Sequence, residues 1–206
     1  MSSVFQRMKI FNIEAGCEEI LKSKSSEVKF PLTEPALDLI EKMKSELYQL
    51  EGVGLAAPQV GINLQIVAIY IPKSACLLRD NSKCYPMHVL INPRYQGIES
   101  DGFSMDYEFC YSVSSKAGKV RRYNSIKLEY QDESGKSFST IETGFYGRVL
   151  QHEIDHLCGL LIIDRLTPHC VHGGIDEMIS QRRGELSDDK KEIFDEIMKK
   201  KKLIKV

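Results

Sequence analysis

The sequence predicts an α+β fold in which mixed or antiparallel sheets pack around a central helix. Helical and extended patterns do not alternate along the chain, which argues against a doubly wound parallel sheet. Residues 126–130 and 138–141 flank an Asp-Glu-Ser-Gly turn at 132–135, as expected for a hairpin. Residues 145–157 repeat apolar side chains at helical spacing, so this segment supplies the central helix.

The first half of the chain is expected to form an amphipathic helix, a glycine-rich turn and two strands. Thr33 can cap the helix, with Pro35 in its first turn. The apolar face of this helix consists of Leu37, Ile40, Met43, Leu47 and Leu50. The glycine-rich residues 52–61 break the helix, and the apolar runs 65–71 and 89–91 indicate buried strands.

The second half ends in two helices of different character. In the central helix, Val149, Leu150, Ile154 and Leu157 form an apolar stripe, and Gly159 is placed to end the helix. In the last helix, at about 187–204, the side chains expected to point inward are Ile193, Phe194, Ile197 and Met198. Its lysines alternate with acidic residues, which is typical of a solvated helix face. We therefore expect a single domain over residues 1–206 with an exposed C-terminal helix.

Composition and charge argue against several classes of function. The chain has 206 residues, 42% of them hydrophobic, which suits one domain with a sizeable core. Its 28 basic and 29 acidic side chains leave a formal charge of −1, which gives no electrostatic reason for direct nucleic-acid binding. No run of about eighteen apolar residues indicates a membrane span, and residues 1–10 lack the apolar stretch of a secretory signal. We expect a soluble, cytoplasmic protein.

Six cysteines are scattered along the chain without paired spacing. They are Cys17, Cys76, Cys84, Cys110, Cys158 and Cys170. In a chain of this size without a secretory signal, free thiols or a metal ligand are expected rather than a disulfide framework.

The residues most informative about chemistry lie in the central helix, in the run Gln151-His-Glu-Ile-Asp-His156. Two histidines four positions apart project from one face of a helix, so His152 and His156 can bind one metal ion. Glu153 follows the first histidine and can take a proton from water at that metal. The apolar stripe faces the core, so the two histidines are expected to face a cleft.

Two histidines do not complete a metal site, and the helix pattern leaves the third ligand open. A third histidine after Gly159, as in one class of zinc protease, is excluded because Ile162 stands at that position. Glu177 and Cys110 are the two main candidates. Weaker options are His88, His169 and His172.

Three motifs in fixed order resemble those of the peptide deformylase family. They are Gly52-Val-Gly-Leu-Ala-Ala-Pro-Gln59, Glu108-Phe-Cys-Tyr-Ser112 and the histidine run on the central helix. The first and third match the family pattern at every defined position, and the second at three of five. The resemblance extends over about residues 35–167 and includes Gly147-Arg-Val-Leu before the third motif.

The resemblance implies a role for each matched residue. The implied metal ligands are Cys110, His152 and His156. Glu153 would be the general base and then the general acid. Gln59 would donate its side-chain amide to the developing oxyanion, together with the backbone N–H of Tyr111. Backbone around Gly54 would pair with the substrate peptide as an added strand.

The resemblance also implies the reaction, the cofactor and the partners. The reaction is hydrolytic removal of formyl, as formate, from the N-terminal formylmethionine of nascent peptides. The cofactor is one divalent transition metal, with Fe²⁺ favoured and Ni²⁺, Co²⁺ or Zn²⁺ also suited to one thiolate and two imidazoles. The expected partners are N-formylmethionyl peptides and, transiently, the ribosome, with no direct nucleic-acid binding and no membrane contact.

The second motif departs from the family pattern. Phe109 replaces the usual glycine and Tyr111 the usual leucine, and Ser114 and Ser115 stand where the family usually has a proline. A glycine permits a close approach that a large side chain forbids, so we expect Phe109 to change the shape of the pocket. Outside the motifs, Arg122 is a candidate partner for Glu108.

Three other interpretations fit parts of the sequence. Residues 52–57 also fit a dinucleotide fingerprint, but that motif needs a strand before it and a helix after it, the reverse of the order here. A metallopeptidase would use Glu177 as third ligand. A non-catalytic, deformylase-like protein would bind N-terminal peptides without hydrolysing them. Asp155 is either a partner of the residues around the metal or an ordinary polar position on the helix.

Overall fold

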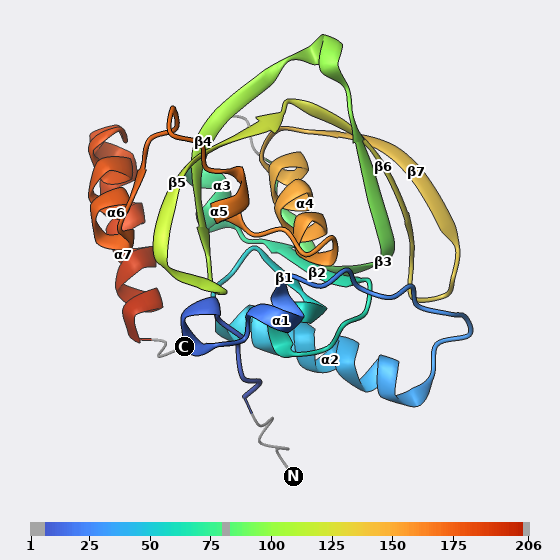
Figure 1. The fold of residues 1–206 in the computed structure, drawn as a ribbon. Helices are drawn as coiled ribbons and strands as arrows, with labels where there is room; N and C mark the ends of the chain where they lie inside the picture. Colours follow the sequence, from blue (N-terminus) through green and yellow to red (C-terminus); the bar gives the residue numbers. More distant parts are fainter. Residues whose placement is uncertain (1–6, 80–82, 204–206) are drawn as a thin grey trace.

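A computed structural model describes residues 7–79 and 83–203, and it confirms the predicted α+β class. The order along the chain is η1 (Ile13–Ala15), α1 (Glu18–Leu21), α2 (Glu34–Gln49), β1 (Gly54–Ala56), η2 (Ala57–Val60), β2 (Ile66–Ile71), α3 (Lys73–Leu77), β3 (Tyr85–Gly97), η3 (Glu99–Asp101), β4 (Phe103–Cys110), β5 (Val113–Tyr123), β6 (Ser125–Gln131), β7 (Ser137–Thr143), α4 (Gly144–Leu157), α5 (Ile162–Arg165), β8 (His172–Gly173), α6 (Ile175–Gly184) and α7 (Asp188–Leu203). The named strands form two antiparallel sheets, β1-β2-β3-β6-β7 and β4-β5-β8. Helix α4 lies between them (Figure 1).

The five-stranded sheet is buried on both faces around β2, which explains its continuous apolar run. Val67 and Ile69 belong to the core shared with α4, whereas Ile66 and Ala68 belong to the core shared with α2. The predicted hairpin is present as β6 and β7, which pair from Ser125 opposite Thr143 onward. This sheet therefore forms the layer between α2 and α4.

Three details of the first half differ from expectation. Leu37 was predicted on the inward face of α2, but its side chain is 43% exposed, because the buried face runs through Ala36 and Leu39 instead. Thr33 occupies the N-cap position without a side-chain hydrogen bond. The glycine-rich segment is more than a turn, since it contains the short edge strand β1 and the helix η2.

The three-stranded sheet is covered by α6, and α7 lies beside α6 (Figure 1) and also contacts α3. Met178 of α6 is 1% exposed and packs with Tyr107 and Ala117 of the sheet. In α7, Phe194 is buried and Ile197 is half-buried, in line with the predicted inward side. The expected end of the last helix, at about 204, and residues 1–6 lie outside the described residues.

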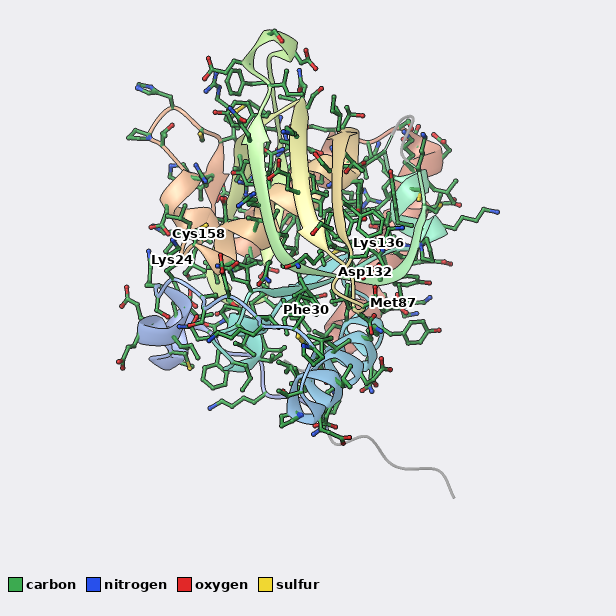
Figure 2. All side chains as sticks on the ribbon, turned by 90° about the vertical axis from the view of Figure 1, so that its right-hand side faces the viewer. Lys24, Phe30, Met87, Asp132, Lys136 and Cys158 are labelled. Carbon is green, nitrogen blue, oxygen red and sulfur yellow. The ribbon has the colours of Figure 1, made fainter. Side chains whose placement is uncertain are left out.

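The turn between β6 and β7, at one end of the five-stranded sheet, carries Asp132 and Lys136 (Figure 2). Asp132 accepts hydrogen bonds from the backbone N–H groups of Ser134 and Lys136, and Phe30 lies against this turn at Gly135. All six cysteines are free thiols, as predicted. No helix in the described part of the chain combines the length and the apolar character that a membrane crossing requires.

Candidate metal centre

Helix α4 brings both histidines and the glutamate into the interior. Its predicted stripe packs as expected, with Leu150 fully buried and Val149, Ile154 and Leu157 nearly so, all in the core shared with the five-stranded sheet. The helix ends where predicted, and Gly159 follows with φ +72°, a left-handed conformation that favours glycine. Because one face is held by the five-stranded sheet, the histidine face is turned toward β4 of the three-stranded sheet, where Glu108 and Cys110 lie.

The third member of the cluster comes from the end of β4. The Sγ atom of Cys110 lies 3.3 Å from Nε2 of His156, and the rings of His152 and His156 are 5.1 Å apart between centroids. One ligand atom from each residue lies within 4.8 Å of the others. Among residues 7–79 and 83–203, this is the one group of three or more metal-ligating side chains that converge.

The converging side chains fit a catalytic metal site. One thiolate and two imidazoles are suitable ligands for a divalent transition metal, and three protein ligands leave a coordination position open for water or substrate. Glu177 lies on α6, outside this group, where its carboxylate accepts a hydrogen bond from Gln181. The structure therefore gives no support to Glu177 as third ligand.

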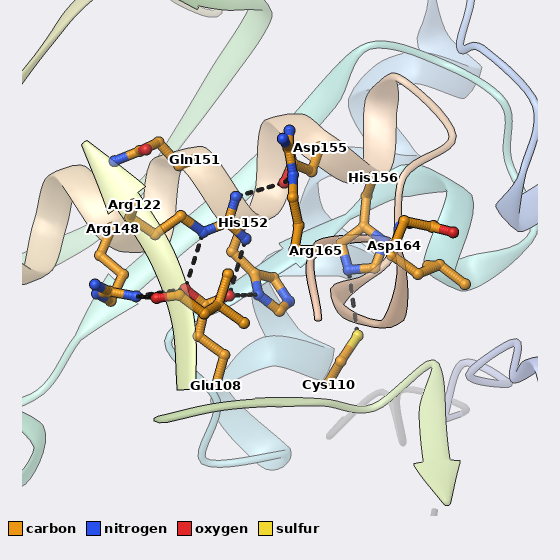
Figure 3. Close-up of polar contacts among 12 residues, drawn as sticks. Glu108, Cys110, Arg122, Arg148, Gln151, His152, Asp155, His156, Asp164 and Arg165 are labelled. Carbon is orange, nitrogen blue, oxygen red and sulfur yellow. Dashed lines mark hydrogen bonds and ion pairs between the residues drawn. The ribbon is translucent and has the colours of Figure 1, made fainter. Parts of the chain in front are cut away.

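Glu108 orients the first histidine. Its Oε2 atom accepts a hydrogen bond from Nδ1 of His152 at 2.9 Å, which leaves Nε2 of that ring for a metal (Figure 3). Arg122 binds the same carboxylate in a bidentate manner, at 3.0 and 2.9 Å, which confirms the predicted pair. Arg148 donates to Oε1 of Glu108 at 2.9 Å. Both oxygens of this buried carboxylate therefore accept hydrogen bonds.

Asp155 extends the same network. It is therefore a partner of the residues around the metal cluster and not an ordinary polar position on the helix. It accepts hydrogen bonds from Arg122 and, at 2.9 and 2.6 Å, from Arg165 of α5. The hydroxyl of Tyr95 also donates to it at 3.3 Å. Burial, and then the charge of Asp155, raise the pKa of Tyr95 to about 12, so this phenol remains a donor. The network links α4 to both sheets and to α5.

The network sets the charge state around the histidines. Burial by itself favours the neutral form of Glu108, but hydrogen bonds from His152 and Arg122 outweigh it and hold its pKa below the ordinary value. Burial lowers the pKa of His152, whereas its hydrogen bonds to Cys110 and Glu108 raise it, and the net direction is upward. Burial and the charge of His152 both lower the pKa of His156. Glu108 is therefore a carboxylate that favours an N–H on Nδ1 of His152.

Glu153 lies beside the cluster in a buried position. It is 4% exposed, and its Oε2 atom has no hydrogen-bond partner among the described residues. Burial raises its pKa to about 7, which suits a general base near neutral pH. Its carboxylate lies against Gly54, where an added Cβ would approach Oε1 to 2.3 Å. Only glycine at residue 54 leaves room for this carboxylate.

Gln59 presents an amide N–H to the cluster. Its Oε1 accepts a hydrogen bond from the backbone N–H of Ala56 at 2.8 Å, which fixes the orientation of the amide. The Nε2 atom therefore faces Ser112 Oγ at 3.3 Å and Cys110 Sγ at 3.8 Å. Helix η2 and strand β1 hold this side chain in a buried position. The arrangement directs a donor toward the space beside the thiol.

Tyr111 makes a side-chain contact that the sequence did not indicate. Its hydroxyl donates to the carbonyl of Leu50 at 2.8 Å, and its ring lies against Gly52. Its own carbonyl accepts from the side chain of Asn12 at 3.1 Å. The residue that replaces leucine in the second motif therefore links that motif to the glycine-rich segment.

The cluster opens onto a groove of about 1160 Å³. Its lining includes Gln59, Cys110, His152 and Glu153, together with Gly54 from the edge strand β1. Of the sequence-predicted site residues, all but His156 line this cavity, and His156 is buried beside Cys110. Sequence reasoning missed Arg148, Arg165 and Tyr95 as members of the network, although Arg148 belongs to the run Gly147-Arg-Val-Leu noted above.

Comparisons with known proteins agree on one family. The family model described as polypeptide deformylase matches residues 10–171. A peptide deformylase of Halothermothrix orenii is 36% identical over 77% of this chain and 95% of its own length, and peptide deformylase 2 of Pseudomonas syringae is 38% identical over 68% and 76%. A class I type b peptide deformylase of Acinetobacter baumannii, solved with bound Met-Ala-Ser, has a TM-score of 0.69 and 26% identity, covering 79% of this chain and all of that one. A Synechococcus elongatus peptide deformylase solved with actinonin has a TM-score of 0.65 and 26% identity, covering 82% and 86%.

Proposed function

This chain belongs to the peptide deformylase family, and we propose that Cys110, His152 and His156 hold its catalytic metal beside the base Glu153. As a member of that family it is a metal-dependent hydrolase that removes the formyl group from the N-terminal methionine of nascent peptides. The observation that carries the assignment of residues is the convergence of one thiol and two imidazoles, within 4.8 Å, next to a buried carboxylate.

We propose Fe²⁺ as the natural metal, as membership of the family implies. One thiolate and two imidazoles also suit Ni²⁺, Co²⁺ or Zn²⁺, which could occupy the same site. A metal held there would act as a Lewis acid toward the formyl oxygen and would lower the pKa of water. Glu108 would keep the first histidine ligand in the correct tautomer, through the hydrogen bond to Nδ1 of His152.

The residues of the chain divide the remaining chemistry among them. Glu153 takes the proton of the attacking water and then delivers it to the departing amine of methionine. The side-chain amide of Gln59 and the backbone N–H of Tyr111 donate to the negative charge that grows on the formyl oxygen. One such donor is typically worth about 3 kcal/mol in other hydrolases. The fixed orientation of the Gln59 amide supports its part in this scheme.

Strand β1 supplies the substrate-binding edge. It is the outermost strand of the five-stranded sheet, and Gly54 lies beside both the groove and the base. We propose that the backbone at Gly54 pairs with the substrate peptide as an added strand. Formyl is the smallest acyl group, so a tight fit beside Glu153 and Gln59 would exclude acetyl.

Partners and cellular context follow from the same assignment. The solved Acinetobacter relative binds a Met-Ala-Ser peptide, which supports N-formylmethionyl peptides as the substrates of this chain. We propose a cytoplasmic location and a transient ribosome contact, without membrane contact. The formal charge of −1 supports the absence of direct nucleic-acid binding. Residues 1–206 are proposed to form one domain with its C-terminal helix at about 187–204.

Turnover of formyl-Met-Ala-Ser by protein purified without oxygen and loaded with Fe²⁺ tests the proposed function. Glu153→Gln is expected to lower kcat at least about 100-fold while metal content stays unchanged. Binding of the peptide without any turnover would instead assign the chain to the non-catalytic alternative. Acetyl-Met-Ala-Ser should not be hydrolysed, and equal turnover of the two acyl groups would contradict a tight formyl pocket.

Metal content tests the ligand set separately. Cys110→Ser is expected to lose stoichiometric metal, whereas Glu177→Gln should retain it, because Glu177 lies on α6 outside the converging group. The opposite pattern in these two variants would move the third ligand to Glu177.

A further inference from the structure

The groove that contains the catalytic residues is larger than the reaction centre requires. Its volume of about 1160 Å³ lies above the range of about 300–1,000 Å³ usual for small-molecule pockets. Beyond Gln59, His152 and Glu153, the lining includes side chains of α6 and α7. The match to the family model ends at residue 171, before both helices begin. One wall of this groove is therefore built by a part of the chain outside the matched region.

Most side chains of that wall are apolar, and the exception is Arg182 of α6, which pairs with Asp106 of β4. Six apolar side chains from α6, α7, β4 and the end of α3 line the groove, and together they are named the outer apolar pocket: Leu78, Phe109, Ile179, Phe194, Ile197 and Met198. Phe109 is 38% exposed and stands one residue before Cys110. The outer apolar pocket is thus continuous with the metal cluster through β4.

The outer apolar pocket is held in place by packing and by polar contacts. Met178 fixes α6 on the three-stranded sheet, and Glu185, just after α6, accepts from Tyr107 at 2.9 Å and pairs with Lys119 at 2.8 Å. Arg183 binds Asp195 of α7 in a bidentate manner, at 2.7 and 2.8 Å. Because these side chains are already held in place, binding of a ligand does not incur the entropic cost of ordering them.

We infer that the outer apolar pocket holds an apolar side chain from the nascent peptide, in its second to fourth residues. The inference rests on the proposed function, because it takes the formylmethionine to lie at Glu153. An extended peptide advances about 3.3 Å per residue, so the residues after methionine must continue along the groove beyond the cluster. Continuity of the groove with the reaction centre favours the substrate over any other occupant.

A peptide series tests the pocket directly. Formyl-Met-Ser-Ser-Ser is compared with peptides that carry leucine at position 2, 3 or 4, using the Fe²⁺-loaded full chain. Burial of one leucine side chain is expected to raise kcat/KM about tenfold at one of these positions. A preference below about twofold at every position would overturn the inference.

Two substitutions from different elements show whether the preference comes from the outer apolar pocket. Phe109→Gly and Ile197→Ser should each bring the leucine-to-serine ratio of kcat/KM toward one. Ile141→Ser is the matched control, because Ile141 is 66% exposed on β7, at the opposite edge of the five-stranded sheet from β1. A preference that survives either pocket substitution, or that falls equally in the control, would overturn the inference.

Binding of the unformylated peptides separates this inference from the proposed function. If no formyl peptide is hydrolysed, tighter binding of the leucine peptide, lost in Phe109→Gly and Ile197→Ser, would still support the outer apolar pocket. Hydrolysis without any preference would leave the proposed function intact and remove the pocket. Dimers that both pocket substitutions abolish, without a peptide preference, would assign the apolar surface to a second copy of the chain and overturn the inference.

Discussion

The two faces of α4 are held by different kinds of interaction. Toward the five-stranded sheet, Val149, Leu150 and Ile154 pack into an apolar core. Toward the three-stranded sheet, the helix carries His152 and Asp155, which bind charged side chains of β4, β5 and α5 (Figure 3). Apolar burial is non-directional, whereas hydrogen bonds fix angles. The first face therefore holds the helix in place, and the second determines where the metal ligands point.

The apolar face of α4 is expected to govern the stability of the fold, whereas the charged face is expected to govern the geometry of the metal site as well. A substitution on the apolar face should lower the free energy of unfolding without changing the metal affinity of the folded protein. A substitution in the charged network should affect both, because buried carboxylates and guanidinium groups depend on each other for hydrogen bonds.

Arg122→Met is expected to have the largest effect. Arg122 joins Glu108 and Asp155, and all three side chains are at least nine-tenths buried. Removing one partner of a buried ion pair typically costs about 3–5 kcal/mol, and metal content should fall as well. Thermal unfolding and metal analysis measure both changes. Arg94→Met is the control, since the Arg94 side chain paired with Glu129 is 78% exposed and such pairs contribute about 0–1 kcal/mol.

Leu150→Ala tests the contribution of the apolar face of α4. Leu150 is fully buried between α4 and the sheet, so truncation leaves a cavity and should lower the free energy of unfolding by about 3 kcal/mol. Urea unfolding gives this change, and metal titration of the folded variant should give the wild-type affinity. A loss of metal affinity equal to that of Arg122→Met would break the proposed division between the faces.

Glu108→Gln tests the orienting role of the carboxylate. The neutral amide retains the shape of the side chain but weakens its hydrogen bonds to His152 and Arg122. Metal affinity should fall about 10- to 100-fold, as for other partners of metal-bound histidines. Competition with a chelator measures this affinity. Unchanged affinity would show that packing alone orients His152.

Tyr111→Phe is expected to have the smallest effect. It removes one hydrogen bond to the carbonyl of Leu50 and leaves the ring in contact with Gly52. The loss should be about 1 kcal/mol in unfolding free energy, with a higher KM if the glycine-rich segment loosens. Steady-state kinetics and thermal unfolding measure the two changes. Tyr48→Phe is the control, because Tyr48 is 66% exposed on α2.

The sequence predicted those features that depend on local spacing. The spacing of the apolar side chains, together with the residues typical of a helix end and of a turn, predicted α4 and the β6–β7 hairpin. Both are present close to the expected residues. The error at Leu37 arose because the face that α2 buries depends on where the sheet lies, and Ala36 and Leu39 turn inward instead. The pattern alone could not decide between adjacent faces of a helix with many apolar residues.

For the site, the sequence alone determined that His152, Glu153 and His156 share one turn of a buried helix, because four residues make about one helical turn. Only the tertiary structure brought Cys110 to them, since its thiol meets His156 across 46 positions of chain. The pairing of Glu108 with His152 and the apolar wall from α7 were decided in the same way. Helical spacing is a short-range property of the chain, whereas the partner of a buried ligand depends on how the sheets pack around α4.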